Sequence, residues 1–323
     1  PFATVGHAMS NMNDNDWILV APGVYQESLS AYEMNGFLFG IGGMDSTFIT
    51  GSDQGRILEI DYGNWIIGGI TFSDGNTEGD GGAIKVHDGG LMMGGIRFVN
   101  NTAQNIGGAI AALNSNVMID SVFFVMNHST QSDGGALFVE NNLSDQLRTV
   151  VITNTLFAEN TAYSQGAGAY VLSNADNSFI EAYLDSVQFV NNSSYSEAGY
   201  RLYGNVGSNV YNSSFTGNQT QAYAAAGGFS GGANVDMNNC LIAGNQANLG
   251  GGTANSGGFS IWSGSAGSFY NCTFSDNSAE FGSALTVGGG SYAFFDASII
   301  WNNPGDNALA AVQWDDNGST LEV

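Results

Sequence analysis

Hydrophobic and polar residues alternate over many short stretches of this chain. The clearest stretches are "LMMGGIRFV" at 91–99, "VMIDSVFFV" at 117–125 and "IEAYLDSVQFV" at 180–190. An apolar residue at every second position predicts a β-strand with one buried face. Beyond residue 16 no stretch has a helical period of useful length, so the pattern predicts an all-β chain.

Two motifs accompany these strands and keep a constant phase with each other. The first is Phe-x-x-Asn, with Ile in place of Phe at 242 and 300, and its asparagines from Asn101 onward lie 26 to 33 residues apart. The second is Gly-Gly-Ala, at 81–83, 107–109 and 134–136, which decays to "GAGAY" at 166–170 and "FGSAL" at 281–285. Such a period indicates a repeat architecture, in which each unit buries its apolar face against its neighbours.

The spacing predicts a right-handed, single-stranded parallel β-helix, a solenoid of about 26 residues per coil. Some coils carry insertions of about six residues, near 140–148, 172–180 and 250–256. We expect residues 1–16 to form an N-terminal cap with a short helix, and residues 17–323 to form one continuous β-helix. The closing "STLEV" resembles the middle of a strand, which predicts that the β-helix is truncated at its C-terminal end.

Equivalent positions in successive coils should lie about 4.8 Å apart, the spacing of paired strands. The aromatic positions would then form an internal stack, comprising Phe98, Phe124, Phe157, Phe189, Phe215 and Phe274. The asparagines would form a ladder in one turn of each coil, comprising Asn101, Asn127, Asn160, Asn192, Asn218, Asn245, Asn277 and Asn303. Asparagine suits a turn because it tolerates left-handed backbone angles and its amide bonds backbone groups.

Charge and cysteine content narrow the functional classes. The chain has 29 acidic residues against 5 basic ones, a net charge of −24, which argues against nucleic acid and anionic membrane surfaces as partners. Only Cys240 and Cys272 are present, so no disulfide framework is predicted. Each lies two residues before a column residue, and we expect two buried thiols on successive coils. The chain contains no run of 18 apolar residues, so no transmembrane helix is predicted.

The repeated motifs resemble a known family. "FVNN" at 98–101 and "GGAI" at 107–110 resemble the FxxN and GGA[ILV] repeats of the chlamydial polymorphic outer-membrane proteins, and related repeats in large secreted proteins of marine and Bacteroidota-like bacteria. "DNDWILVAPGVYQESL" at 14–29 is similar to the opening coil of the pectin-lyase-like β-helix superfamily. The resemblance implies a secreted or cell-surface bacterial module, such as an adhesin passenger, whose partner is a host or neighbouring-cell surface.

Lyases of that superfamily use Arg or Lys as a base, often beside Ca²⁺ held by carboxylates. The corresponding candidates here are Lys85 and His87, with Asp88, on one outward wall, and Arg97 one strand away. The simpler interpretation is a set of solvated surface residues. Candidate acids for a hydrolase are scattered among turns as Asp74, Asp80, Asp133, Glu140, Asp276, Asp315 and Asp316.

No cofactor is predicted, and a bound Ca²⁺ ion is the alternative left open by the oxygen-rich stretches at 11–16 and 314–318. The main functional prediction is a non-enzymatic adhesin passenger or rigid stalk. One alternative is a polysaccharide-active lyase or hydrolase. The other is a self-associating extracellular filament, paired through the exposed last coil.

Overall fold

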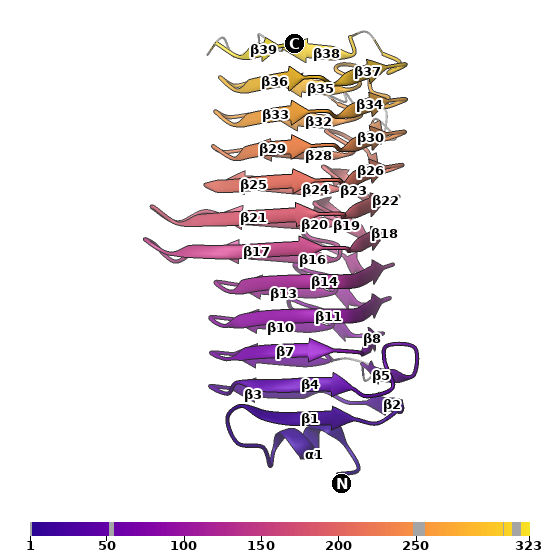
Figure 1. Cartoon of the computed structure of the whole chain (residues 1–323), viewed down its shortest axis with the longest axis vertical. Coiled ribbons are helices and arrows are strands. Elements are labelled where there is room, and N and C mark those ends of the chain that lie inside the picture. The colour runs from indigo at the N-terminus through magenta and orange to yellow at the C-terminus, as the bar shows by residue number, and fades with distance from the viewer. Residues whose placement is uncertain (1, 52–54, 248–255, 306, 312–317) are drawn as a thin grey trace.

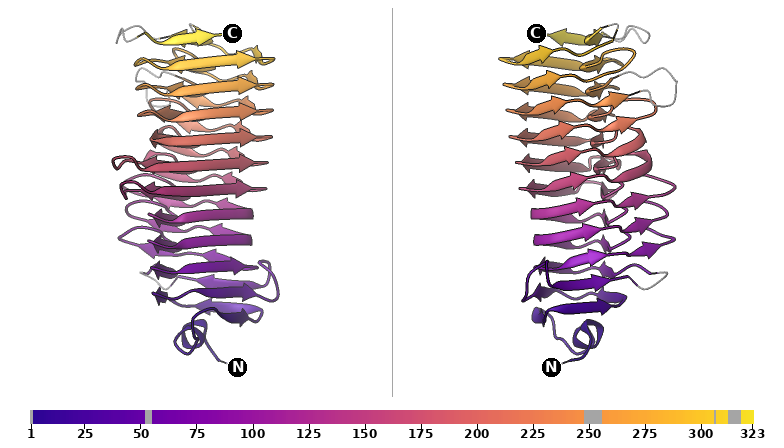
Figure 2. Two further views of the ribbon diagram at one scale, coloured as in Figure 1. Left: turned by 60° about the vertical axis from the view of Figure 1, so that its left-hand side comes forward. Right: turned by 90° about the vertical axis from the view of Figure 1, so that its right-hand side faces the viewer.

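The computed structural model describes residues 2–51, 55–247, 256–305, 307–311 and 318–323. Its coils stack along one axis, with the N-terminus at one end and the last coil at the other (Figure 1). Strands facing the viewer run from left to right while the chain climbs, which is the right-handed sense. The predicted all-β, right-handed parallel β-helix is therefore confirmed, and two further views show the same stack (Figure 2).

Three parallel sheets run along the described part of the chain. The largest, sheet A, has 21 strands: β1 (Asp16–Val20), β2 (Gly23–Gln26), β4 (Gly36–Gly40), β5 (Thr47–Thr50), β7 (Asn64–Gly68), β8 (Thr71–Ser73), β11 (Gly90–Val99), β14 (Asn116–Val125), β17 (Leu147–Thr153), β18 (Leu156–Ala158), β21 (Phe179–Asp185), β22 (Gln188–Val190), β25 (Val206–Tyr211), β26 (Ser214–Thr216), β29 (Asn234–Asn238), β30 (Leu241–Ala243), β33 (Ala266–Tyr270), β34 (Thr273–Ser275), β36 (Tyr292–Asp296), β37 (Ile299–Trp301) and β39 (Thr320–Glu322).

The other two sheets complete each coil. Sheet B contains β3 (Leu29–Tyr32), β6 (Leu58–Asp61), β10 (Ile84–His87), β13 (Ile110–Leu113), β16 (Leu137–Asn141), β20 (Ala169–Ser173), β24 (Tyr200–Gly204), β28 (Gly227–Ser230), β32 (Phe259–Ile261), β35 (Leu285–Val287) and β38 (Leu309–Ala311). Sheet C contains β9 (Asn76–Thr77), β12 (Thr102–Ala103), β15 (His128–Ser129), β19 (Thr161–Gln165), β23 (Ser193–Ser196), β27 (Gln219–Thr220) and β31 (Gln246–Ala247). From β10 to β32 the chain passes from sheet B through sheet A to sheet C and returns to sheet B.

The register of sheet A stacks the column residues directly on one another. Phe98 of β11 pairs with Phe124 of β14, which pairs with Phe157 of β18. The rings of Phe124 and Phe157 lie 4.7 Å apart with an interplanar angle of 1°. The parallel stack extends from Phe72 to Phe215, and all of its rings are fully buried. It stops at Ile242, the position where the sequence replaces the aromatic residue.

The asparagines three residues after this column are bonded from coil to coil. In each step the side-chain amide and the backbone N–H of one asparagine both donate to the Oδ1 of the next. The amide of Asn160 also donates to the carbonyl of Phe124 at 3.1 Å. These steps run without a break from Asn101 to Asn303, with amide-to-oxygen distances of 2.8 to 3.0 Å. The buried amide groups and backbone N–H groups of these asparagines thereby find hydrogen-bond partners inside the coil stack.

Glycine is required where the second motif turns into sheet B. Gly107 has a φ of 66°, and a Cβ added at Gly108 would lie 2.0 Å from the carbonyl oxygen of Gly135 in the next coil. A side chain at the second position would therefore push adjacent coils apart. The Gly-Gly-Ala motif is therefore needed for the close packing of adjacent coils.

The N-terminal end is covered by α1 (Val5–Met9), which packs against β1 and β3. Val5 and Met9 are buried, whereas Phe2 precedes the helix and is exposed. The predicted short N-terminal helix is therefore confirmed. Thr4 caps it, and the carboxylate of Glu27 accepts hydrogen bonds from the N–H groups of Val5 and Gly6 at 2.8 and 2.7 Å.

Two predicted insertions lie in the described part of the chain. They fall at the turns that precede β17 and β21, whose ends project beyond the neighbouring coils (Figure 1). Asn141 holds the first turn, because its amide donates to the carbonyl of Gln146 at 2.9 Å. The third predicted insertion, near 250–256, lies almost entirely outside the described residues.

Candidate functional site

Lys85 and His87 occupy the outward side of β10, on either side of buried Val86. The Nζ atom of Lys85 lies 3.6 Å from Oδ2 of Asp80, so its charge is already partnered. In the next coil the register places Ala111 and Leu113 beside these two residues. The polar group therefore does not continue into the coil of β13.

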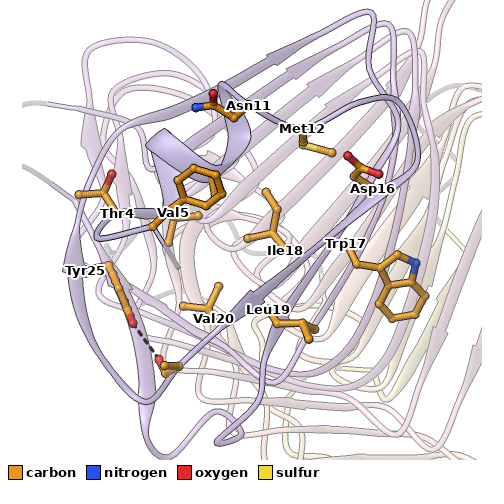
Figure 3. Close-up of a pocket in the computed structure, with 13 residues that line it drawn as sticks. Thr4, Val5, Asn11, Met12, Asp16, Trp17, Ile18, Leu19, Val20 and Tyr25 are labelled. Atoms are coloured by element: carbon orange, nitrogen blue, oxygen red, sulfur yellow. Dashed lines mark hydrogen bonds between the residues drawn. The ribbon is translucent and has the colours of Figure 1, made fainter.

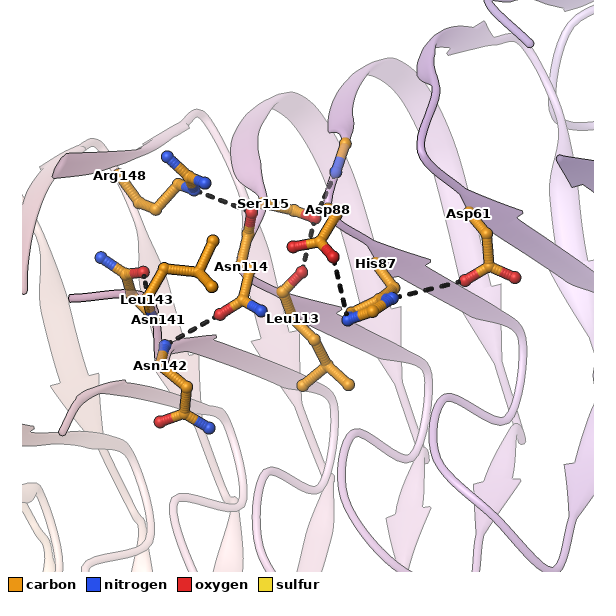
Figure 4. Close-up of polar contacts among 11 residues, drawn as sticks. Asp61, His87, Asp88, Leu113, Asn114, Ser115, Asn141, Asn142, Leu143 and Arg148 are labelled. Carbon is orange, nitrogen blue, oxygen red and sulfur yellow. Dashed lines mark hydrogen bonds and ion pairs between the residues drawn. The ribbon is translucent and has the colours of Figure 1, made fainter. Parts of the chain in front are cut away.

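His87 lies between two carboxylates (Figure 4). Its Nδ1 atom is 3.7 Å from Oδ1 of Asp61, and its Nε2 atom is 3.3 Å from Oδ2 of Asp88. Asp88 occupies the turn after β10 with a φ of 51°, and its other oxygen is buried without a hydrogen-bond partner in the described structure. The imidazole therefore lies close to one carboxylate of the preceding coil and one of its own coil.

Arg97 is not part of this group. It lies in β11 of sheet A, where its Nη2 atom is 3.0 Å from Oδ1 of Asp45. Its guanidinium also lies 5.9 Å from the centre of the Phe123 ring. The structure thus brings Lys85, His87 and Asp88 together on one wall and leaves Arg97 on another.

Arg148 lies two coils beyond His87 and has a positional role (Figure 4). Its Nε–H donates to the carbonyl of Asn114 at 2.7 Å, and the N–H of Asn142 donates to Oδ1 of Asn114 at 2.8 Å. Asn114 itself has a φ of 52°. Arg148 and Asn142 therefore tie the first insertion to the preceding coil.

A denser ionisable cluster lies farther along sheet B. It consists of Asp133, Tyr170, Glu197 and Arg201, which occupy three successive coils. Arg201 is 6 % exposed, and its Nε–H and Nη2–H groups donate to Gln165 Oε1 and Ser230 Oγ at 3.1 and 2.7 Å. Tyr170 and Tyr203 flank it, with ring centres 6.0 and 5.6 Å from the guanidinium carbon. This arginine therefore links the end of β19 in sheet C to the end of β28 in sheet B.

Burial changes the protonation behaviour of the cluster. It raises the pKa of Tyr170 to about 12, although nearby Arg201 acts in the opposite direction. Burial also raises the pKa of the Asp133 carboxyl, against the hydrogen bonds from Ser164 and Gln165. Glu197 is 7 % exposed and accepts a hydrogen bond from the hydroxyl of Ser196. Because Glu197 and Arg201 are more than nine-tenths buried, a substrate has little access to them.

The phase of the Gly-Gly-Ala motif in the sequence indicates part of this cluster. Asp133, Gln165 and Glu197 each come directly before the Gly-Gly-Ala position of their coil, so they share one column. The register places Arg201 at the position of Lys85 in its own coil, four residues after Glu197 where Lys85 comes five residues after Asp80. Both relationships become visible only when the coils are aligned on the Gly-Gly-Ala motif.

An end pocket of about 380 Å³ lies between α1 and β1 (Figure 3). Its apolar wall includes Val5, Ile18 and Val20, and the hydroxyl of Tyr25 donates to the carbonyl of Ala21 at 3.1 Å. Trp17 forms its outer rim and stacks on Phe37 with ring centres 4.6 Å apart. The pocket is the space left where the short helix covers the first coil.

Neither oxygen-rich stretch forms a cluster of acidic ligands where its structure is described. Asp14 and Asp16 accept hydrogen bonds from neighbouring asparagines, and 314–317 lie outside the described residues. Within the described ranges, no group of three or more His, Cys, Asp and Glu residues is placed to hold a metal ion. In the same part of the chain, no helix has the length and apolar character needed to cross a membrane.

The coil motif has a counterpart among known proteins. Residues 95–113 match the model of the Chlamydia polymorphic membrane protein repeat. This segment runs from the second half of β11 through β12 to β13, and it contains Phe98, Asn101 and the Gly-Gly-Ala turn. The chain thus carries a chlamydial-type repeat as a unit of its parallel β-helix.

A PL6 alginate lyase solved in complex with a trisaccharide aligns over 99 % of this chain and 84 % of its own, with 9 % identity and a TM-score of 0.44. No curated protein matches the chain significantly.

Proposed function

We propose that the chain is a non-enzymatic β-helix module, secreted or displayed on the cell surface, that acts as an adhesin passenger or a rigid stalk. The observation that carries the proposal is the repeat at 95–113, which resembles that of a membrane-protein family and recurs along the molecule. Its Phe-x-x-Asn motif builds the internal Phe stack and Asn ladder, and its Gly-Gly-Ala motif lets adjacent coils pack closely. A rod whose successive coils are joined by hydrogen bonds and stacked rings resists bending. Its outer walls are therefore held in fixed positions.

An exposed apolar row on sheet A supports a role in adhesion. The register aligns Trp17, Phe37, Ile66, Met92 and Met118 on the outward side of five successive coils. Trp17 is 63 % exposed, and the two methionines are 41 % and 43 % exposed. Contiguous apolar surface of this kind is typical of protein contact sites, and Met adapts well to varied partners.

Surface display is tested with antibodies raised against the purified chain. Intact cells that produce the natural protein should be labelled, and protease added outside should remove the label. Labelling that appears only after the cells are permeabilised would contradict the proposal. Purified outer or secreted fractions serve as the positive comparison.

A polysaccharide-active enzyme is the second candidate, because Asp133 carries a raised pKa beside Tyr170, Glu197 and Arg201. The test is incubation with neutral and uronic-acid polysaccharides, followed by assays for new reducing ends and unsaturated uronates. We expect neither product. Activity that is lost in Asp133→Asn or Lys85→Ala would overturn the non-enzymatic proposal.

A further inference from the structure

The outer face of sheet C is an uncharged strip on a strongly acidic molecule. The register of its seven strands aligns one outward residue from each coil, namely Asn76, Thr102, His128, Thr161, Ser193, Gln219 and Gln246. These side chains offer hydroxyls, amides and one imidazole, and none is a carboxylate. The chain as a whole carries a net charge of −24, so this wall differs from the rest of the sequence.

Two exposed tyrosines stand beside this strip on adjacent coils. Tyr163 follows Ala162 in β19 and is 68 % exposed, while Tyr195 follows Ser194 in β23 and is 54 % exposed. The pairing of β19 with β23 is regular through Ala162 and Ser194, and the register shifts between Ala162 and Gln165, the interval that contains Tyr163. Such a bulge re-aims side chains and is common next to binding sites. Both rings therefore project outward at the place where the sheet departs from its regular pairing.

The tyrosines line a groove of about 620 Å³ together with Thr161, Ser164, Ser193 and Gln221. No charged side chain lines it within the described structure. Its base is held by backbone hydrogen bonds, because the carbonyl of Tyr195 accepts from the N–H groups of Gln221 and Ala222 at 3.2 and 2.9 Å. The hydroxyl of Thr161 is held by His128 Nδ1 at 2.8 Å. The groove is thus pre-formed, which lowers the entropy cost of binding.

We propose that this groove binds a neutral saccharide chain. Exposed tyrosine rings contact the apolar faces of sugars, and the surrounding hydroxyls and amides bond to sugar hydroxyls. The lining provides no cation to recognise an acidic sugar, and the negative field of the protein repels uronate polymers. The site extends over neighbouring coils of sheet C, so it accommodates a chain that runs along the β-helix axis (Figure 1).

The proposal of a saccharide site does not depend on the proposal that the chain is secreted or displayed on the cell surface. Saccharide binding is measured on the purified chain, whereas display is measured on cells, so either proposal can fail alone.

The test is native-gel affinity electrophoresis of the purified chain in gels containing dextran, mannan, xylan or β-glucan, with alginate and polygalacturonate as acidic comparators. At least one neutral polysaccharide should slow the migration of the chain. Tyr163→Ala and Tyr195→Ala should each weaken its binding by about tenfold, which is the loss of one aromatic contact. Tyr183→Ala is the matched control, because Tyr183 is 40 % exposed on sheet A, and it should bind as the natural chain does.

The Tyr195→Phe variant keeps the ring and removes the hydroxyl, so it distinguishes ring contact from hydroxyl bonding. It also shows whether a loss of binding in Tyr195→Ala comes from a folding defect. It should keep most of the affinity, and its circular dichroism and melting temperature should match those of the natural chain. The proposal is overturned if no neutral polysaccharide slows migration, if the two alanine variants bind unchanged, or if only the acidic polymers bind.

Discussion

Asn160 gives two hydrogen bonds to a single oxygen of Asn192 in the next coil. Its side-chain amide donates to Oδ1 of Asn192 at 2.9 Å, and its backbone N–H donates to the same oxygen at 3.1 Å. Both residues are fully buried. One carboxamide therefore fixes the backbone of a turn and the register between two coils, and the same unit is repeated along the stack.

Replacing Asn160 with Ala should strongly destabilise the protein. The change leaves the N–H and amide of Asn127 without their acceptor and the carbonyl of Phe124 without a donor. We expect a loss of roughly 3 to 5 kcal/mol, since each buried polar group left unpaired costs about 1 to 3 kcal/mol. Urea unfolding followed by circular dichroism measures the effect. Asn142→Ala, at an exposed position in a turn, should have little effect, and equal effects of the two changes would contradict the ladder's role.

The aromatic stack should tolerate shape changes better than truncation. Phe157→Ala removes a fully buried ring between Phe124 and Phe189 and should cost about 3 to 5 kcal/mol. Phe157→Ile should cost clearly less, because the chain itself places Ile242 at an equivalent position of a later coil. Thermal melting of the two variants checks this order. If Ile proved as damaging as Ala, the column would depend on ring stacking more than on filled volume.

The two thiols should be inert in the folded protein. Cys240 and Cys272 are buried and unbonded to each other, and the neighbouring Cys272 thiol, together with burial, raises the pKa of Cys240 well above its usual range. A thiol reagent should label neither residue until the chain is unfolded in urea. Rapid labelling of the native protein would contradict the buried arrangement.

Serine should replace Cys272 with a change of less than about 1 kcal/mol, the usual range for a substitution that keeps its contacts. The Sγ atom of Cys272 contacts the carbonyl of Tyr270 at 3.3 Å, and Ser213 two coils earlier makes the matching hydroxyl-to-carbonyl bond with Tyr211 at 2.7 Å. Melting temperature is the readout. Cys272→Val, which has no donor, is the matched comparison.

Asp133 should make the protein less stable at neutral pH. Burial raises its pKa in the folded state, so the folded chain holds this proton to a higher pH than the unfolded chain does. Stability is therefore lost as pH rises from the unfolded value of about 3.9 through the folded pKa. Asp133→Asn removes the charge and keeps the oxygen that accepts from the N–H of Gln165.

This variant should melt at a higher temperature than the natural chain at pH 7, and the difference should vanish below a pH of about 3.5, where both forms are neutral. Melting curves across this pH range provide the measurement. Asp236→Asn, on an exposed strand position, controls for the change in net charge and should show no such trend.

The fold features that the sequence alone predicts all follow from its repeat. Phe98 and Asn101 recur in phase with Gly107–Ala109, and a solenoid converts equal phase into direct stacking, so the fold class and the inward columns follow from spacing. The short N-terminal helix was predicted, but its local sequence does not show that the carboxylate of Glu27 accepts from the N–H groups of Val5 and Gly6 at the start of the helix. Its hydrogen bonds come from a residue outside the local pattern.

The outward residues required the tertiary structure. Gln165 and Arg201 are 36 positions apart, and their hydrogen bond depends on coil lengths that insertions make unequal. Outward side chains do not repeat from coil to coil, because solvent does not impose the packing constraint that the core imposes on Phe and Asn. The sequence by itself therefore determined the parallel β-helix and its internal columns. Only the folded structure decided which surface side chains meet, including Tyr163 and Tyr195, because that depends on the register between coils.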